Sequence, residues 1–197
     1  MTKILVVSGH TDLQKNSFAN KIILDRLSEI MPEAEYVYLD TEYPGWTFNV
    51  EREQERLKSA DVIVMQFPFF WYGVPSIMHT WMEEVFVHGF SHGSKGKALV
   101  GKKLLVSFTS GAPEEMYQTG GVQGYPVDDF LTPLKQFARA CGMEWTGYVY
   151  SGGLSYASRH DDEKLRQMKE KALLHAERVA EKVRSLGRWL TKAKTPA

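Results

Sequence analysis

The chain has 197 residues, 43% of them hydrophobic and 24% charged, so it is long enough for a substantial core and too apolar for disorder throughout. Lysine plus arginine and aspartate plus glutamate number 24 each, and this balance provides no global attraction to nucleic acid or to an anionic membrane. The single cysteine, Cys141, excludes an intramolecular disulfide framework and is expected to be a buried apolar residue. The start of the chain is too polar for a signal peptide and no apolar run has membrane-spanning length, which predicts a cytoplasmic protein.

Two kinds of segment alternate along the chain. Short apolar runs, rich in β-branched and aromatic residues, predict strands that are buried on both faces. These runs cover residues 4–8, 34–39, 61–67, 103–108 and 144–150. Segments with apolar residues at helical spacing follow them, at residues 18–30, 51–59, 75–86, 127–141 and 161–186. Five such repeats predict one α/β domain over residues 1–197, with a parallel sheet that carries helices on both faces.

Three helix ends carry specific signals. Asn16 or Ser17 would cap the first helix, because a short polar side chain can accept bonds from the free N–H groups there. Pro75 suits the first turn of the third helix. Gly187 would end the last helix and leave residues 187–197 as a basic tail.

The loops at the carboxyl ends of three strands have unusual compositions. An open parallel sheet binds its ligands beyond these ends, near the point where the strand order reverses. The loops in question are residues 9–17, 68–74 and 109–125. Their coincidence at one edge of the sheet is the main functional signal in the sequence.

The first loop leads into a helix, whose free backbone N–H groups and dipole favour an anion. Ser17 and Asn20 could add donors, and His10 could contact a phosphate or ribityl group. The loop lacks both GxGxxG and GxxxxGK[ST], which disfavours a dinucleotide-type Rossmann site and excludes a P-loop. An ordinary capped helix start remains the structural alternative.

The second loop, FPFFWYGVP, concentrates four aromatic residues where exposure is costly: Phe69, Phe70, Trp71 and Tyr72. They either pack into the core or line a flat apolar ligand such as an isoalloxazine ring. In the glycine-rich third loop, Thr109, Ser110 and Gly111 can offer donors to the polar edge of such a ring. The phenol of Tyr117 could stabilise negative charge on the reduced ring, or it could be an ordinary surface tyrosine.

Several other groups have a simpler structural interpretation. His79, His88 and His92 follow no standard zinc pattern, so no metal is expected. A small basic cluster is usually solvated, although it could meet an NADPH phosphate; its members are Lys95, Lys97, Lys102 and Lys103.

The aromatic loop and its surroundings carry a resemblance. The segment QFPFFWYGVP at residues 66–75, followed by Trp81 and by the segment EVF at residues 84–86, resembles the NAD(P)H:quinone oxidoreductase family. Further similar segments lie in order along residues 4–150, at His10, 17–20, 109–111, 116–117 and 121–124. Other residues are shared with the ancillary flavoprotein of glutathione-gated potassium efflux and general stress relatives: Tyr43, Pro44, Asn49, Glu53, Gln54, Glu55, His88 and Gly89.

This resemblance implies a flavodoxin-like three-layer sandwich with strand order 2-1-3-4-5. It also implies FMN or FAD, bound non-covalently, and usually a homodimer with each site near the partner chain. The flavin phosphate and ribityl group would be held by His10, Ser17, Phe18, Ala19 and Asn20. The ring would be flanked by Phe69, Phe70, Trp71 and Tyr72, and its pyrimidine side would be met by Thr109, Ser110, Gly111 and Ala112. FMN is preferred, because nothing in the sequence identifies an adenine pocket.

The implied activity is two-electron, ping-pong hydride transfer from NAD(P)H to quinones or similar acceptors. Tyr117 matches a tyrosine that assists hydride transfer, whereas Gln123 stands where mammalian members have a histidine. Gln123 could therefore hydrogen-bond a quinone oxygen but could not serve as a proton donor. One alternative is a regulatory subunit of a potassium efflux system, peripherally associated with the membrane transporter. An electron-carrier flavodoxin is disfavoured because such carriers are acidic and this chain is neutral.

Overall fold

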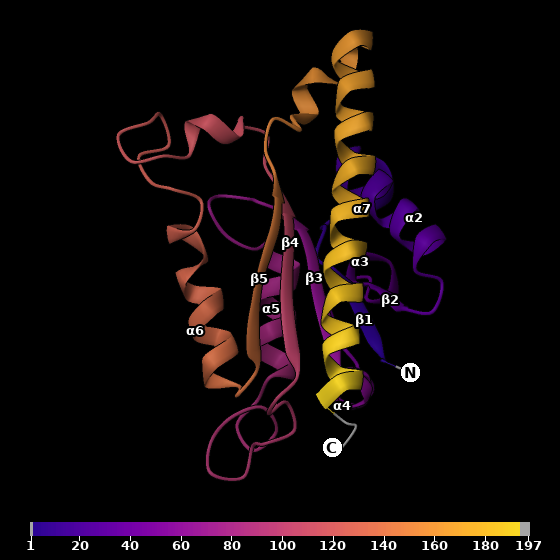
Figure 1. The fold of residues 1–197 in the computed structure, drawn as a ribbon, viewed down its shortest axis with the longest axis vertical. Helices are drawn as coiled ribbons and strands as arrows, with labels where there is room; N and C mark the ends of the chain where they lie inside the picture. The colour runs from indigo at the N-terminus through magenta and orange to yellow at the C-terminus, as the bar shows by residue number, and fades with distance from the viewer. Residues whose placement is uncertain (1, 194–197) are drawn as a thin grey trace.

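The computed structural model describes residues 2–193, whose strands form one parallel sheet of five in the order β2-β1-β3-β4-β5. The strands are β1 (Ile4–Ser8), β2 (Glu35–Tyr38), β3 (Val62–Pro68), β4 (Lys103–Thr109) and β5 (Glu144–Ser151). The predicted fold class and strand order are confirmed. Because every pairing is parallel, all carboxyl ends lie at one edge, with the loops that follow β3 and β4 (Figure 1).

Helices cover both faces of the sheet (Figure 1). Helices α2 (Ala19–Ile30) and α7 (Asp162–Ala193) lie together on one face. The other face carries α4 (Val50–Ser59), α5 (Ser76–Val85) and α6 (Thr132–Ala140). Short helical turns connect these elements: α1 (Leu13–Asn16), α3 (Leu39–Glu42) and the 3-10 turns Glu114–Met116, Asp129–Leu131 and Tyr156–His160.

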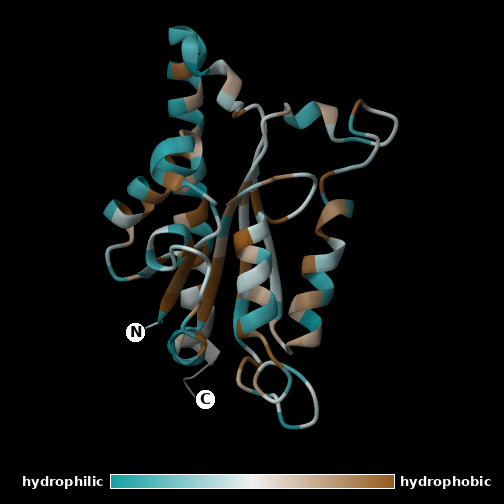
Figure 2. Cartoon of the chain, turned by 180° about the vertical axis from the view of Figure 1, so that it is seen from behind, coloured by the Kyte–Doolittle hydropathy of each residue, from teal (hydrophilic) through white to brown (hydrophobic). Residues whose placement is uncertain are grey.

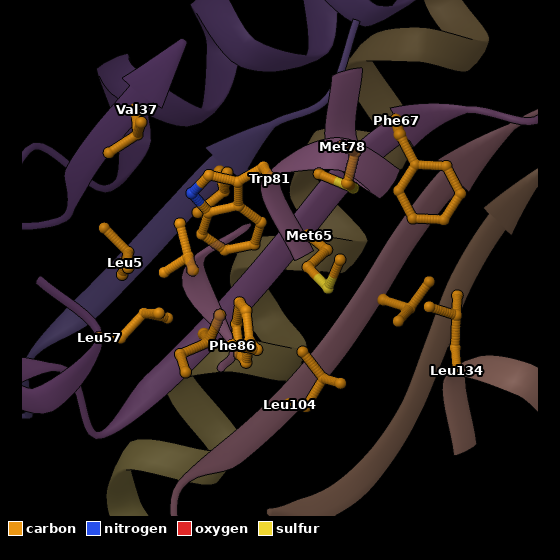
Figure 3. Packing of buried hydrophobic residues seen from close by; sticks show 14 of the residues in the cluster. Leu5, Val37, Leu57, Met65, Phe67, Met78, Trp81, Phe86, Leu104 and Leu134 are labelled. Carbon is orange, nitrogen blue, oxygen red and sulfur yellow. The ribbon is translucent and has the colours of Figure 1, made fainter. Parts of the chain in front are cut away.

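Alternation along each strand divides the core into two layers. Leu5, Met65 and Leu104 point to the α4–α5–α6 face and gather around Trp81 and Phe86 (Figure 3). Their neighbours in sequence point to the α2–α7 face and pack against the apolar stripe of α7. Hydrophobic residues are therefore concentrated on the strands and on the inner sides of the helices (Figure 2).

One carboxylate is buried within the first layer. Glu53 is fully buried, and its oxygens accept bonds from Tyr43 Oη at 2.7 Å and from Trp81 Nε1 at 3.0 Å. Arg56 Nη1 lies 2.5 Å from Glu53 Oε1 and forms an ion pair with it, so the buried carboxylate is not an isolated charge. Tyr43 and Glu53, which carry part of the family resemblance, thus pack in the core. Cys141 is buried as expected.

Three helix boundaries differ from expectation. The N-cap position of α2 falls on Phe18, because the chain makes the separate turn α1 first, but Ser17 Oγ still accepts the Lys21 backbone N–H at 3.3 Å and so satisfies one free N–H group of the first turn, as predicted. The helix expected over 127–141 is divided into a 3-10 turn and the shorter α6. Helix α7 continues through Gly187 to Ala193, since one glycine costs a helix only about 1 kcal/mol. The rest of the expected tail, residues 194–197, lies outside the described residues.

Within residues 2–193, no helix combines the length and apolar character needed to cross a membrane.

Candidate functional site

Two adjoining hollows open at the carboxyl edge of the sheet. The first has a volume of about 340 Å³ and is lined by residues from the loops after β1, β3 and β4. Ten predicted site residues line it: His10, Ser17, Phe18, Ala19, Asn20, Phe69, Phe70, Thr109, Ser110 and Gly111. The second, of about 210 Å³, shares three of them and adds Trp71, Tyr72, Ala112, Tyr117 and Gln123. The fold thus brings all the predicted site residues together.

Other lining residues were not anticipated from the sequence. Asn16 and Pro68 flank predicted residues, whereas Leu154, Ser155, Tyr156 and Met168 come from the segment after β5 and from α7. The loop after β5 had no unusual composition, although its position at a fourth carboxyl end was a usable signal.

The first hollow has a polar end built from His10 and the start of α2. His10 is buried, and its Nδ1 accepts the Asp12 backbone N–H at 3.0 Å. Burial lowers the pKa of His10, an effect that the nearby carboxylates of Asp40 and Asp12 partly oppose. The ring is therefore neutral with its proton on Nε2, which is available as a donor. Beside it, the first N–H groups of α2 have no intrahelical partners and present a positive dipole end.

A tight, strained turn forms the aromatic side of the site. Phe70 and Gly73 exchange backbone hydrogen bonds of 3.2 and 3.1 Å across Trp71 and Tyr72. Both intervening residues have positive φ angles, 46° and 65°, which normally favour asparagine or glycine. Tyr72 stacks on Phe130 with 5.3 Å between ring centroids, while the Trp71 side chain is 95% exposed. Strain of this kind in a bulky, exposed residue is typical of functional sites.

Tyr117 stands at the end of a 3-10 turn in the third loop. Its ring contacts those of Phe69 and Tyr150, with centroids 6.2 and 6.0 Å away. Burial raises the pKa of Tyr117, and this outweighs the opposite effect of Ser110. The phenol is therefore protonated at neutral pH and able to donate a hydrogen bond.

The third loop approaches β5 closely. A Cβ atom on Gly152 would lie 2.7 Å from the Glu114 nitrogen and 2.8 Å from the Ala112 carbonyl oxygen. Only glycine permits this approach without a backbone shift. Ser110 is fixed nearby, because it donates to the Ala112 carbonyl at 2.7 Å and accepts a bond from Tyr150 Oη at 2.7 Å.

A buried polar network lies under the first hollow. Asn20 Nδ2 donates to Thr109 Oγ1 at 2.9 Å, and Gln66 Nε2 donates to Asn20 Oδ1 at 2.8 Å. Ser107 Oγ donates to Gln66 Oε1 at 2.5 Å and also contacts His175 Nε2 at 2.8 Å. Sequence analysis did not assign a role to Ser107 or His175. Their signal was a polar residue in an otherwise apolar strand or helix stripe.

His175 connects this network to β5. Its Nδ1 lies 2.9 Å from Ser151 Oγ, and the whole side chain is buried. Burial lowers the pKa of His175 to about 3, and the Arg178 charge acts in the same direction. The imidazole is therefore neutral across the physiological range.

The basic cluster lies away from the site. Lys102 and Lys103 are at the start of β4, the opposite edge of the sheet. Lys102 Nζ donates to the Lys58 and Ala60 carbonyls, both at 2.6 Å, and Lys103 Nζ pairs with Glu144 at 2.6 Å. Lys102 and Lys103 thus have structural partners at the edge of the sheet opposite the two hollows and cannot meet a phosphate there. In residues 2–193, no three His, Cys, Asp or Glu side chains group as metal ligands.

Comparisons with known proteins agree with this arrangement. The family described as flavodoxin-like fold matches residues 2–176. The chain belongs to this family. A Bacillus subtilis relative named "Uncharacterized NAD(P)H oxidoreductase YrkL" is 33% identical over 161 residues, covering 81% of this chain and 90% of the relative.

Two further comparisons come from other bacteria. The glutathione-regulated potassium-efflux system ancillary protein KefG of Serratia proteamaculans is 34% identical, covering 73% of this chain and 77% of the relative. The solved structure of general stress protein 14 from Treponema denticola, in complex with FMN, has a TM-score of 0.73 at 24% identity, covering 89% of this chain and 99% of that one. At that identity the solved structure demonstrates the shared fold.

The strained turn yields a stability prediction. In the monomer, Trp71→Asn should raise the free energy of unfolding by about 1 kcal/mol, because asparagine tolerates the positive φ angle and the indole loses no packing within the single chain. Urea denaturation measures this change. Trp71→Phe, which keeps the backbone penalty, should match the parent; a Trp71→Asn protein no more stable than the parent would show that the turn is unstrained.

His175 yields a pH prediction. Its pKa is about 3 in the folded protein against 6.5 in an unfolded chain, so between these values only the unfolded state binds the proton. This contribution to stability is complete above pH 6.5 and is lost as the pH falls toward 3, at up to about 1.4 kcal/mol per unit. Denaturation between pH 7 and 5 should show a shallower pH dependence for His175→Gln than for the parent. Equal slopes would contradict a buried neutral histidine.

Proposed function

We propose that this protein is a flavin-dependent NAD(P)H oxidoreductase that passes two electrons from NAD(P)H to a quinone or similar acceptor. The observation that carries the proposal is the continuity of the two hollows. A polar end with neutral His10 and the α2 N-terminus leads directly to an aromatic wall and a neutral phenol. An elongated ligand with an anionic end and a flat ring matches this sequence of surfaces. The relative named as an NAD(P)H oxidoreductase supports the same class of reaction.

The residues present fit FMN. The anionic phosphate would be held by His10 Nε2 and the free N–H groups at the start of α2, with Ser17 and Asn20 nearby. The ring would lie against the aromatic turn of residues 69–72 and meet the backbone of residues 109–112. The fold neighbour from Treponema denticola, solved with FMN, supports this choice.

A bound flavin supplies the hydride chemistry, accepting two electrons from NAD(P)H and releasing them to the acceptor. The chain's own residues supply position and electrostatics. The aromatic turn provides a rigid wall against which planar substrates can stack. NAD(P)H and the acceptor would occupy this place one after the other, which gives ping-pong kinetics. Tyr117, held neutral by burial, donates a hydrogen bond to negative charge that develops in the second hollow. Gln123 lines the same hollow and can bond a quinone oxygen.

Exposed apolar residues around the site support a homodimer. Trp71, Val122 and Tyr125 are 95%, 81% and 62% exposed, and all three belong to the loops at the carboxyl edge. A second copy of the chain would cover them and complete each site.

The similarity to the KefG ancillary protein supports a second candidate function. In that role the protein would be a regulatory subunit of a potassium efflux system, associated peripherally with the transporter, and its reductase activity would be incidental. Co-purification with such a transporter from a membrane extract would favour this role.

An absorbance titration tests the reductase proposal. The purified protein, or the protein reconstituted with FMN, should show flavin bands that bleach when NADPH or NADH is added without oxygen and return when a quinone is added. A protein that takes up neither FMN nor FAD would overturn the reductase proposal and leave the regulatory role first.

Tyr117 gives a sharper prediction. Tyr117→Phe should slow flavin reduction about tenfold or more in single-turnover mixing, because the hydrogen bond to developing charge is lost while the ring packing remains. Flavin content should stay at the parent level. Tyr38→Phe, which alters a phenol on β2 outside both hollows, is the matched control; equal reduction rates for all three proteins would contradict the role of Tyr117.

A further inference from the structure

The buried polar network has a defined direction. Arg178 can only donate, and its Nη2 donates to Ser151 Oγ at 2.6 Å. At the other end, Asn20 donates to Thr109 Oγ1, and the single proton of Ser107 is donated to Gln66. Because the Ser107 proton is used in this way, His175 Nε2 must donate to Ser107. The neutral ring then has an acceptor at Nδ1, which receives the proton of Ser151.

These bonds form one chain in which each member donates to the next. It runs from Arg178 through Ser151, His175, Ser107, Gln66 and Asn20 to Thr109. Thr109 lines the first hollow, and its oxygen accepts the last bond of the chain, so its own proton is not used within the chain. Hydrogen bonds aligned in this way polarise one another, and a cationic first donor strengthens the effect.

The chain is built into the tertiary structure rather than into a loop. Six of its seven members are nine-tenths or more buried, among them Gln66, Ser107, Ser151 and His175 with no exposed surface. Gln66 and Ser107 are register partners on β3 and β4, as are Thr109 and Ser151 on β4 and β5. Two residues earlier on the same strands are Val64, Leu105 and Val149, all in the apolar layer beneath α7. Burying polar side chains next to this apolar layer costs free energy unless each of them is hydrogen-bonded.

We infer that His175 is a positioning residue for the ligand of the first hollow: it acts as the Nε2–H tautomer and aims the Thr109 hydroxyl proton at an acceptor on that ligand. The inference rests on the proposed function for the identity of the ligand, FMN. The tautomer and direction of the chain do not depend on it. His175 is not among the residues that line the hollow, and it acts through the side chains of Ser107, Gln66, Asn20 and Thr109.

The tautomer can be tested without flavin. In flavin-free protein with ¹⁵N-labelled histidine, NMR should show a neutral ring at pH 7 with its proton on Nε2, assigned by its loss in His175→Gln. A proton on Nδ1, or a charged imidazolium, would overturn the inference. This result stands even if the protein binds no flavin, so a failure of the proposed function is recognised separately.

The effect on the ligand is tested by FMN affinity, measured from the quenching of FMN fluorescence. His175→Leu and Ser151→Ala break the chain and should raise the FMN Kd roughly three- to tenfold, the value of one hydrogen bond. His175→Gln, whose amide can accept from Ser151 and donate to Ser107, should restore the parent Kd. Ser151→Ala provides the test if the leucine variant does not fold.

Two comparisons separate this role from a general loosening of the core. Ser91→Ala is the matched control, because Ser91 is also fully buried and bonded to a histidine, 2.9 Å from His92 Nδ1, outside the site. It should leave the FMN Kd unchanged. The double variant His175→Leu with Thr109→Val should bind FMN as weakly as Thr109→Val alone, since both changes remove the same bond. Additive losses, or an equal loss in Ser91→Ala, would overturn the inference.

Discussion

The architecture depends on one constraint, the pairing of polar side chains in a layer that caps the apolar core. Beneath α7 the strands are apolar up to Val64, Leu105 and Val149, and the next residues facing α7 are polar. Burying such groups costs free energy unless they are hydrogen-bonded, and Gln66, Ser107 and His175 satisfy one another. This layer marks where packing ends and the site begins. It also joins three strands and two helices into a rigid floor for the hollow.

Above this floor the site works with dipoles and hydrogen-bond donors rather than with charges. Burial lowers the pKa of His10 and of His175 and so keeps both rings neutral, and it raises the already high pKa of the Tyr117 phenol. In the proposed function, the anionic end of the ligand would be met by backbone N–H groups and a helix terminus rather than by charged side chains. The proposed hydride transfer benefits from such a preorganised, weakly charged surface, because charge that develops in the reaction is met without solvent rearrangement.

Two local features of the site depend on the stability of the core. One is the strained turn at Trp71 and Tyr72, and the other is the close packing of the third loop against Gly152. Positive φ angles at Trp71 and Tyr72 present aromatic faces that a relaxed turn would not present in this way. Gly152 allows the 112–114 segment to lie against β5, which places Tyr117 opposite the turn. Strands β1, β3 and β4 are buried along their whole length, and this packing stabilises the fold enough to offset the strain of the turn.

The sequence by itself determined the order of the elements, the parallel sheet and the three loops that form the site, because apolar periodicity and glycine or proline breaks are short-range signals. It did not determine the start of α2, the division of the segment 127–141 or the length of α7, where packing outweighs local preference. Only the tertiary structure decided the partners of His175, since Ser107 and Ser151 lie 68 and 24 residues away in the chain. Strand order alone brings those residues together, and the direction of their hydrogen bonds follows from which of them has a proton to give.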